Sequence, residues 1–243
     1  NAMGQGLGLV RELVRYLFTR KGFLAISAAH VGMFVKSRPD LTWPDLQYHC
    51  LAGSLDSEAY KRNKLKFDRA PGLTLGHCLV RPESRGSIHA KGPDPRAYPA
   101  IQPNYLSAGA DIDAMLAGYR LTRHIVAQQP LADYIDSEKE PGAALQNDAD
   151  LLAHLREFGT TIYHPVGTCR MGRRDDPAAV VDDSLRVIGL DGLRVVDASV
   201  MPTVISGNTN APAIMVGEKA ADLILGRPVP APVELGSAEA DAA

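Results

Sequence analysis

The stretch YHPVGTCRMG, Tyr163–Gly172, has neither the 3.6-residue period of a helix nor the alternation of a strand. Pro165 biases the backbone of His164 away from the helical region, so an extended loop is expected here. Gly167 and Gly172 allow sharp bends or a close approach of the backbone to a ligand. A histidine on such a loop can act as a general base near neutral pH, or it can hydrogen-bond within its own loop. Taken alone, the stretch favours the structural role, because loop histidines are common.

A second unusual stretch, VVDASVMPTVISGNTNAPAIMVGEKAADLI, spans residues 195–224. It predicts a proline-containing loop and then a helix from about Pro212 to Leu225, with Gly226 just past the helix end. The helix is apolar or small over most of its surface, so we expect it to be buried. Free N–H groups at a helix start favour negative charge. The polar residues before it are candidates for helix caps or for contacts with a polar ligand: Asn208, Thr209 and Asn210.

Composition excludes several classes of protein. The 243 residues are 45% hydrophobic and 22% charged, with a formal net charge of −2, which is ordinary globular composition. This overall balance gives no electrostatic argument for nucleic acid or an anionic membrane as partner. No apolar run reaches the ~18 residues that a membrane-spanning helix needs.

The cysteines indicate the compartment. Cys50, Cys78 and Cys169 show no CxxC spacing and no even count, which argues against a disulfide framework or a zinc site. We therefore expect no metal centre and a reducing, cytoplasmic location, with peripheral association with a membrane left open.

The order of elements predicts an α+β fold with an antiparallel or mixed sheet, because strands cluster early and helices late. The helices are expected over residues 9–18, from Asp111 as N-cap, and from Asn147. A strand is expected after Pro44, and PESRG (residues 82–86) is expected to join two strands as a hairpin. A strand, an Asp191-Gly192 turn and a second strand are expected within residues 185–198.

The two stretches together resemble the C-terminal signature of the glucose–methanol–choline (GMC) flavoprotein oxidoreductases. SRGSI (residues 84–88) and DPRAYPAIQPNYLS (residues 94–107) resemble segments of the family's substrate domain, with choline dehydrogenase-like members most similar. The resemblance runs from about Trp43 to Arg227. It implies a substrate-binding domain over residues 4–165 and a segment over residues 166–227 that completes the FAD domain. Residues 1–3 are typical of a tag remnant, and residues 228–243 of a disordered tail.

The resemblance also implies an activity and a site. Family members oxidise a small alcohol to an aldehyde or ketone and pass a hydride to FAD. His164 matches the family's active-site histidine, and Asn208 matches its partner. Asp197 and Ala198 match a contact to the flavin cofactor, and the segment from Asn208 through Thr209 to Asn210 matches residues along the isoalloxazine ring.

One departure from the family is large. GMC proteins carry an N-terminal GxGxxG unit for the ADP part of FAD, and the glycines near this N-terminus lack that spacing and a preceding strand. We therefore expect a C-terminal fragment that binds FAD weakly or not at all and shows no turnover by itself.

There are two alternative functions. The first is a noncatalytic binding domain derived from the same fold. The second is a hydrolase with His164 as base, which would need a GxSxG nucleophile turn that the sequence lacks. The substrate stays open, since choline would require an aromatic cage and Trp43 is the one tryptophan, and so does the electron acceptor. His124 and His154, in helical patterns, are expected to pack or lie on helix surfaces.

Overall fold

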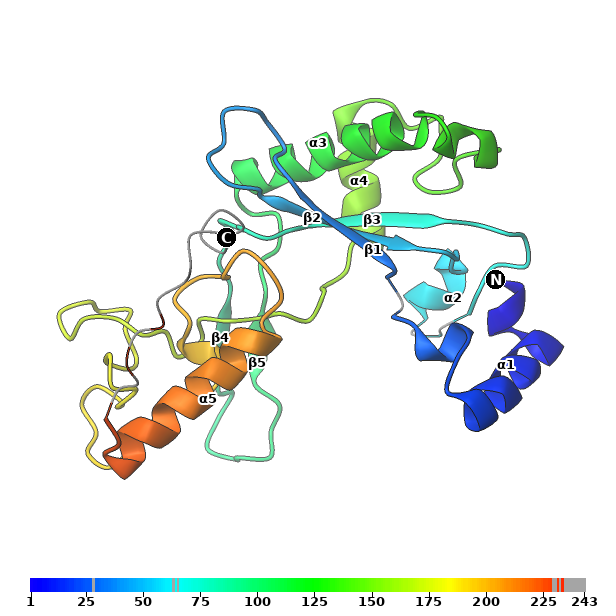
Figure 1. Cartoon of the computed structure of the whole chain (residues 1–243). Coiled ribbons are helices and arrows are strands. Elements are labelled where there is room, and N and C mark those ends of the chain that lie inside the picture. Colours follow the sequence, from blue (N-terminus) through cyan, green and yellow to red (C-terminus); the bar gives the residue numbers. More distant parts are fainter. Residues whose placement is uncertain (28, 63, 65, 229–230, 232, 234–243) are drawn as a thin grey trace. The chain divides into compact units, whose positions relative to one another are not determined.

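The computed structural model describes the chain except for residues 28, 63, 65, 229–230, 232 and 234–243, so most of the expected disordered tail lies outside the described residues (Figure 1). The chain forms two compact units. The first unit comprises Asn1–His164 and Ile205–Gly207, and the second comprises Pro165–Val204 and Asn208–Ala243. The backbone therefore passes from one unit to the other after residues 164, 204 and 207.

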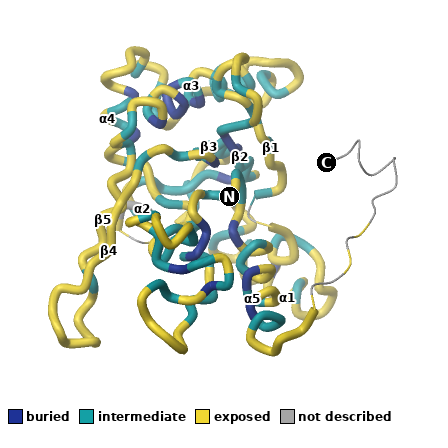
Figure 2. Tube along the Cα trace, turned by 90° about the vertical axis from the view of Figure 1, so that its left-hand side faces the viewer, coloured by how far each residue is buried: buried dark blue, intermediate teal, exposed yellow. Residues whose placement is uncertain are grey.

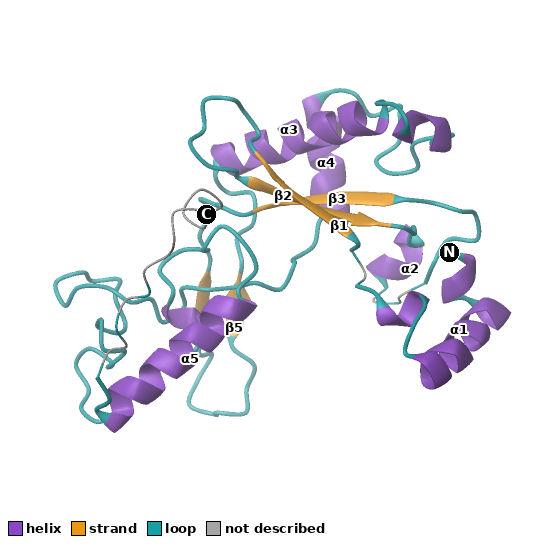
Figure 3. Ribbon diagram, viewed as in Figure 1, coloured by secondary structure: helices purple, strands orange, loops and turns teal. Residues whose placement is uncertain are grey.

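The core of the first unit is a three-stranded antiparallel sheet, ordered β1-β2-β3 (Figure 3). Its strands are β1 (Val31–Val35), β2 (Leu46–Leu51) and β3 (Thr74–Leu79). The register places Tyr48 of β2 between Met33 and His77. Leu46 and Tyr48, on one face of β2, have no exposed area, and Gln47 between them is also buried, so both faces are covered at the start of this strand. The strand predicted after Pro44 is confirmed.

Two helices complete that core: α3 (Gly109–Val126), which packs on the sheet, and α4 (Asp148–Phe158), which packs on α3 (Figure 1). The shared core includes Ala114, Met115 and Leu155. The predicted helix start near Asn147 is confirmed, and the Asn147 side chain caps α4 by accepting a hydrogen bond from the N–H of Asp150 at 2.9 Å.

Asp111 is not an N-cap, because α3 begins two residues earlier, after Ala108. Asp111 is 2% exposed, and its carboxylate accepts hydrogen bonds from the N–H groups of Glu83 and Ser84, at 2.8 and 2.9 Å. Ser84 Oγ in turn accepts from the N–H groups of Ser107 and Ala108. The carboxylate that looked like a cap therefore ties the loop of residues 82–86 to the start of α3.

The predicted hairpin around that loop is wrong. β3 pairs with β2, whereas β4 (Ser87–His89) pairs with β5 (Ala100–Gln102) in a separate two-stranded ribbon. The loop is fixed against α3 rather than closing a tight turn, so the chain leaves the first sheet at this point. All six residues of the ribbon are exposed (Figure 2).

The remaining elements of the first unit are helical. The predicted N-terminal helix is confirmed as α1 (Gly6–Thr19), which ends at Arg20 in the left-handed conformation with φ 54°. The others are one-turn or two-turn segments: η1 (Ala2–Gly4), η2 (Phe23–Ala25), α2 (Ser57–Lys61) and η3 (Leu131–Tyr134).

The second unit has little regular structure. It contains η4 (Ala198–Val200) and α5 (Asn210–Leu225), and its core combines loop residues with one face of α5. The core residues are Val181, Leu185, Val200, Met201, Val216 and Ala220. The predicted strand, turn and strand reduce to an isolated bridge between Arg186 and Arg194.

The helix predicted before Gly226 is confirmed as α5, and Gly226 adopts the left-handed conformation with φ 64°. The expectation that the helix is buried is wrong for the described chain. Ile214 and Met215 near its start, and Ile224 and Leu225 at its end, are all more than half exposed. Within the second unit, loops cover just the face that carries Val216 and Ala220.

The described residues thus confirm the α+β class with antiparallel sheets. None of the helices in the described part of the chain has the length and apolarity that a bilayer crossing requires.

Candidate functional site

The histidine loop begins with a constrained residue. Tyr163 has φ 63°, an unusual value for a residue with a side chain. Its N–H donates to Thr161 Oγ1 at 3.0 Å, and its side chain is 75% exposed. His164 follows, half-buried, as the last residue of the first unit before the chain enters the second. Non-glycine residues in the left-handed conformation concentrate at functional sites, so the conformation of Tyr163 is consistent with a functional role for this loop.

Beyond His164, the two signature stretches lie side by side within the second unit. The N–H of Cys169 donates to the carbonyl of Ser199 at 3.0 Å, and the N–H of Met171 donates to that of Val200 at 2.8 Å. Gly167, at φ 86°, faces the backbone of Met201, where an added Cβ would stand 3.4 Å from the carbonyl oxygen. Backbone groups far apart in sequence are therefore paired.

Asp197 and Ala198 lie where these stretches meet. The Asp197 Oδ1 atom accepts a hydrogen bond from the N–H of Ser199 at 2.8 Å, which caps η4. Ala198 packs against the core of the second unit. Two buried polar atoms nearby, Ser199 Oγ and Arg170 Nε, have no hydrogen-bond partner within the described chain. Such orphaned atoms are uncommon and require an explanation.

The polar triplet before α5 stands at the helix start. Thr209 is buried, with φ −91° and ψ 0°, and makes no side-chain capping hydrogen bond to α5. Asn208 and Asn210 are exposed. The first turn of α5, described throughout, carries no acidic side chain. The positive end of this helix dipole is therefore not offset by a carboxylate of its own turn.

The predicted site residues are divided between the two units. Asp197, Ala198 and the triplet Asn208–Asn210 belong to the second unit, whereas His164 belongs to the first. His164 and Asn208 each border a point where the backbone passes between the units. In the described residues no group of histidine, cysteine and acidic side chains is arranged to hold a metal ion.

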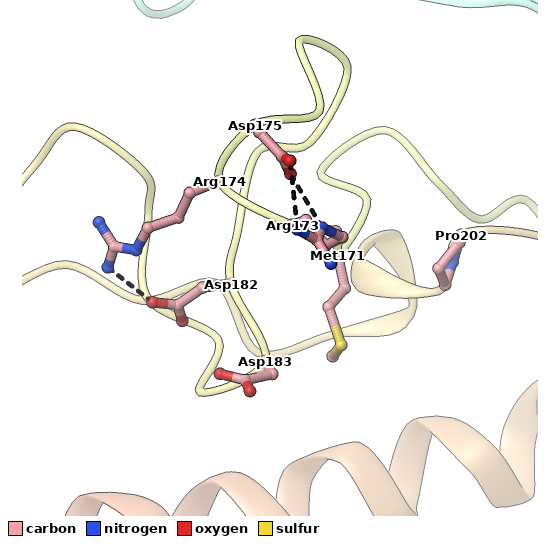
Figure 4. Close-up of a pocket in the computed structure, with 8 residues that line it drawn as sticks. Met171, Arg173, Arg174, Asp175, Asp182, Asp183 and Pro202 are labelled. Atoms are coloured by element: carbon pink, nitrogen blue, oxygen red, sulfur yellow. Dashed lines mark hydrogen bonds and ion pairs between the residues drawn. The ribbon is translucent and has the colours of Figure 1, made fainter.

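A pocket of about 620 Å³ in the second unit escaped the sequence reasoning (Figure 4). Arg173 Nε lies 3.0 Å from Asp175 Oδ1, and Arg174 Nη2 lies 3.0 Å from Asp182 Oδ2. The hydrogen bond from Arg173 lowers the pKa of Asp175. The pKa of Asp182 is also lowered, chiefly because its carboxylate accepts a hydrogen bond from the Arg186 N–H.

None of the predicted site residues lines this pocket. The charge run RRDD, residues 173–176, is the signal that could have indicated it. Because the arginines of this run already form ion pairs with Asp175 and Asp182, we do not assign the chemistry of the chain to the pocket.

A second overlooked cluster lies in the first unit. The His77 ring stacks edge-on with Tyr119, and Tyr119 Oη lies 3.0 Å from His154 Nδ1. The Nε2 atom of His154 lies 3.0 Å from Glu140 Oε2, and its ring stacks on Phe158. Burial lowers the pKa of His77. These rings join α3, α4 and β3, so the packing role expected for His154 agrees with its contacts.

Comparison with known proteins gives consistent relatives. The family described as GMC oxidoreductase matches residues 82–217, more than half of the chain. An alcohol dehydrogenase [acceptor] of Pseudomonas putida is 46% identical over 90% of this chain and 38% of its own length. An oxygen-dependent choline dehydrogenase of Stenotrophomonas maltophilia is 44% identical over 87% of this chain and 37% of its own length.

A solved structure has a similar fold. A formate oxidase of Aspergillus oryzae RIB40, studied for modification of its FAD, superposes with a TM-score of 0.78 and 25% identity over 91% of this chain and 42% of that chain. The chain therefore spans well under half the length of these relatives. From the matched family and the folding of its two signature stretches against each other, the chain belongs to the GMC oxidoreductase family.

Proposed function

We propose that this chain supplies the substrate-binding domain and the closing segment of the flavin domain in a longer enzyme that oxidises an alcohol to an aldehyde or ketone. The observation that carries the proposal is the pairing of the two signature stretches, through the Cys169–Ser199 and Met171–Val200 backbone hydrogen bonds. This pairing fixes the backbone after His164 to the backbone that leads towards Asn208. In this reading the residues 4–165 and 166–227 serve the substrate and the flavin respectively.

His164 is the proposed base. An imidazole can take the proton of a substrate hydroxyl near neutral pH, provided that it lies within hydrogen-bond reach. Asn208 is proposed to orient the same hydroxyl, since a carboxamide both donates and accepts hydrogen bonds without titrating. The left-handed backbone at Tyr163 supports the assignment, because a constrained residue directly before His164 restricts where the imidazole can point.

The residues proposed to hold FAD are Asp197, Ala198, Asn208, Thr209 and Asn210. The second unit fits a large polar cofactor in two respects. Ser199 Oγ and Arg170 Nε are buried without partners in the described chain, and the start of α5 presents N–H groups with no carboxylate in its first turn. N–H groups at a helix start stabilise negative charge on a bound group. When bound, the flavin would accept the hydride that leaves the alcohol carbon.

The free thiols are relevant to the cellular compartment in which the protein works. Cys50, Cys78 and Cys169 are unpaired by disulfides. We propose a cytoplasmic setting, in which such thiols stay reduced.

The first experiment asks whether this chain holds the cofactor by itself. The purified chain is incubated with FAD and desalted, and flavin absorbance is compared with protein concentration. We expect little retention and no alcohol oxidation, because the unit that would bind the ADP part is not among these residues. Stoichiometric retention of FAD would contradict this expectation.

The second experiment separates an enzyme from the alternative, a noncatalytic binding domain of the same fold. The longer protein is assayed with a panel of alcohols and an artificial electron acceptor. Turnover that requires His164 supports the enzyme. A protein that binds FAD stoichiometrically but oxidises none of the alcohols would favour the binding domain.

A further inference from the structure

Helix α1 is attached to the first unit by its polar side. Glu12 is 4% exposed, and its Oε2 atom accepts a hydrogen bond from the N–H of Phe23 at 2.9 Å. Gly22, at φ 98°, turns the chain back so that this contact forms, and an added Cβ there would stand 2.5 Å from the same oxygen. The principal contacts of α1 are with η1 and η2. The carboxylate of the helix is therefore used for internal attachment.

The apolar side of α1 faces outward. At about 100° per residue, its large apolar residues occupy roughly half of the helix circumference. Phe18 is 85% exposed and Leu7 88%. The other members of this exposed apolar face are Leu9, Val10, Leu13, Val14 and Leu17. An exposed and continuous apolar surface of this kind marks an interaction site.

Positive charge borders this apolar face. Arg11 and Arg15 lie on α1, and Arg20 and Lys21 follow directly after it, and all four are exposed. Within residues 1–39 the sequence carries six basic residues and one acidic residue, the buried Glu12. The formal net charge of −2 for the whole chain conceals this local excess.

We propose that the apolar face of α1 docks on an anionic lipid surface, lying parallel to the membrane plane. A helix with one apolar face and flanking arginine and lysine residues inserts at the boundary between head groups and acyl chains. Basic residues at its rim then contact anionic head groups and add to the binding. At 14 residues, α1 is about 21 Å long, too short to span the hydrocarbon core.

Charge complementarity favours a lipid surface over a second copy of this chain. Two copies that met through this face would bring their arginines and lysines together, and like charges at an interface oppose association. An anionic bilayer instead pairs with each of these side chains. The proposal does not depend on the alcohol chemistry proposed above.

The test is flotation of the longer protein, with this purified chain measured beside it, on vesicles of phosphatidylcholine alone or of phosphatidylcholine with phosphatidylserine. We expect association with the anionic vesicles and loss of it as salt is raised. The variant Leu13→Glu/Leu17→Glu should abolish flotation, since both side chains are exposed and their replacement leaves the core intact. The variant Arg11→Gln/Lys21→Gln should weaken binding by about fivefold for each charge removed.

The matched control places the same change on another exposed apolar face. Ile224→Glu/Leu225→Glu, at the end of α5, should float as the unchanged chain does, and circular dichroism should show all variants folded. Absence of flotation of the longer protein with anionic vesicles, even where this chain alone floats, or equal loss in the α5 control, would overturn the proposal. So would a wild-type dimer in light scattering that the Leu13→Glu/Leu17→Glu variant converts to a monomer, because the face would then serve a second copy.

Discussion

The two units of the chain are ordered by different means. In the first unit, backbone groups pair along the ladders of β1, β2 and β3, and side chains such as Tyr48 fill the space under α3, with the Tyr48 hydroxyl donating to the Gly118 carbonyl at 2.7 Å. In the second unit, aspartate side chains accept backbone N–H groups in place of a ladder. Asp176 accepts from Ala178, Asp182 from Ser184 and Arg186, and Asp197 from Ser199.

This difference explains why the loops of the second unit show no repeating period, whereas the strands of the first unit show an alternating pattern. A ladder tolerates many sequences of the right period, whereas a loop held by individual carboxylates and glycines needs particular residues at particular positions. Loops held in this way can position functional groups on a fixed scaffold. The contrast between the units can be tested in four ways.

The largest effect is expected at the passage between the units. In the longer enzyme, His164→Gln should lower kcat by about 10²–10⁴-fold, because a positioned base contributes that much to proton transfer. Steady-state kinetics with an alcohol and an artificial acceptor measure it. His124→Gln, on the exposed side of α3, is the matched control and should leave kcat unchanged. Equal activity of the two variants would remove His164 from the mechanism.

The next effect concerns the ladder-based core of the first unit. Leu46→Ala should lower the free energy of unfolding by about 2–5 kcal/mol, because it leaves a cavity at a fully buried position. Denaturant unfolding followed by circular dichroism reports it. Leu7→Ala, at the exposed start of α1, should change stability by less than about 0.5 kcal/mol. A cost at Leu46 no larger than that at Leu7 would mean that the sheet core contributes little.

A smaller effect is expected where a carboxylate orders the second unit. Asp197→Ala should destabilise η4 by about 1 kcal/mol, since the Ser199 N–H loses its acceptor. Hydrogen exchange of that amide should become faster. Asp197→Asn keeps an oxygen acceptor and should restore most of the protection. If Ala and Asn variants exchange alike, the cap does not order this segment.

The smallest effect is the pH dependence contributed by His77. Burial lowers the pKa of this imidazole below its ordinary value of about 6.5. As pH falls below that value, the unfolded chain takes up a proton that the folded chain resists, so stability is lost down to the lowered folded pKa. His77→Gln should flatten the dependence of the unfolding free energy on pH between pH 7 and the acid limb, and His124→Gln should not. Identical slopes in all three proteins would contradict the assignment.

Local signals in the sequence predicted the local elements well. The apolar residues Leu46 and Tyr48, the helix start near Asn147 and the terminal Gly226 each indicate structure within a few residues, and the structure confirms all three elements. Pairing between distant strands carries no such signal. The expected hairpin was wrong because the partner of β3 is β2, and the loop between β3 and β4 is fixed by Asp111.

The sequence also says which side of a helix is apolar but not what covers it. The period of its apolar residues predicted α1, and α5 was expected to be apolar over most of its surface, yet both helices expose large apolar side chains in the described structure. For the candidate site, the motifs supplied the residues. The backbone bonds between Cys169 and Ser199 could not be anticipated, because they join loops without any repeating period.

The three passages of the backbone between the units have a consequence for inheritance. Because each unit is assembled from two separate stretches of polypeptide, a single genetic crossover cannot exchange one unit for a homologous version while leaving the other whole. Recombinants between related genes would combine segments of both parents within one unit. The segment Ile205–Gly207, which belongs to the first unit, would then have to fit residues from either parent. Selection is therefore expected to keep the stretch from His164 to Asn208 together as one heritable block.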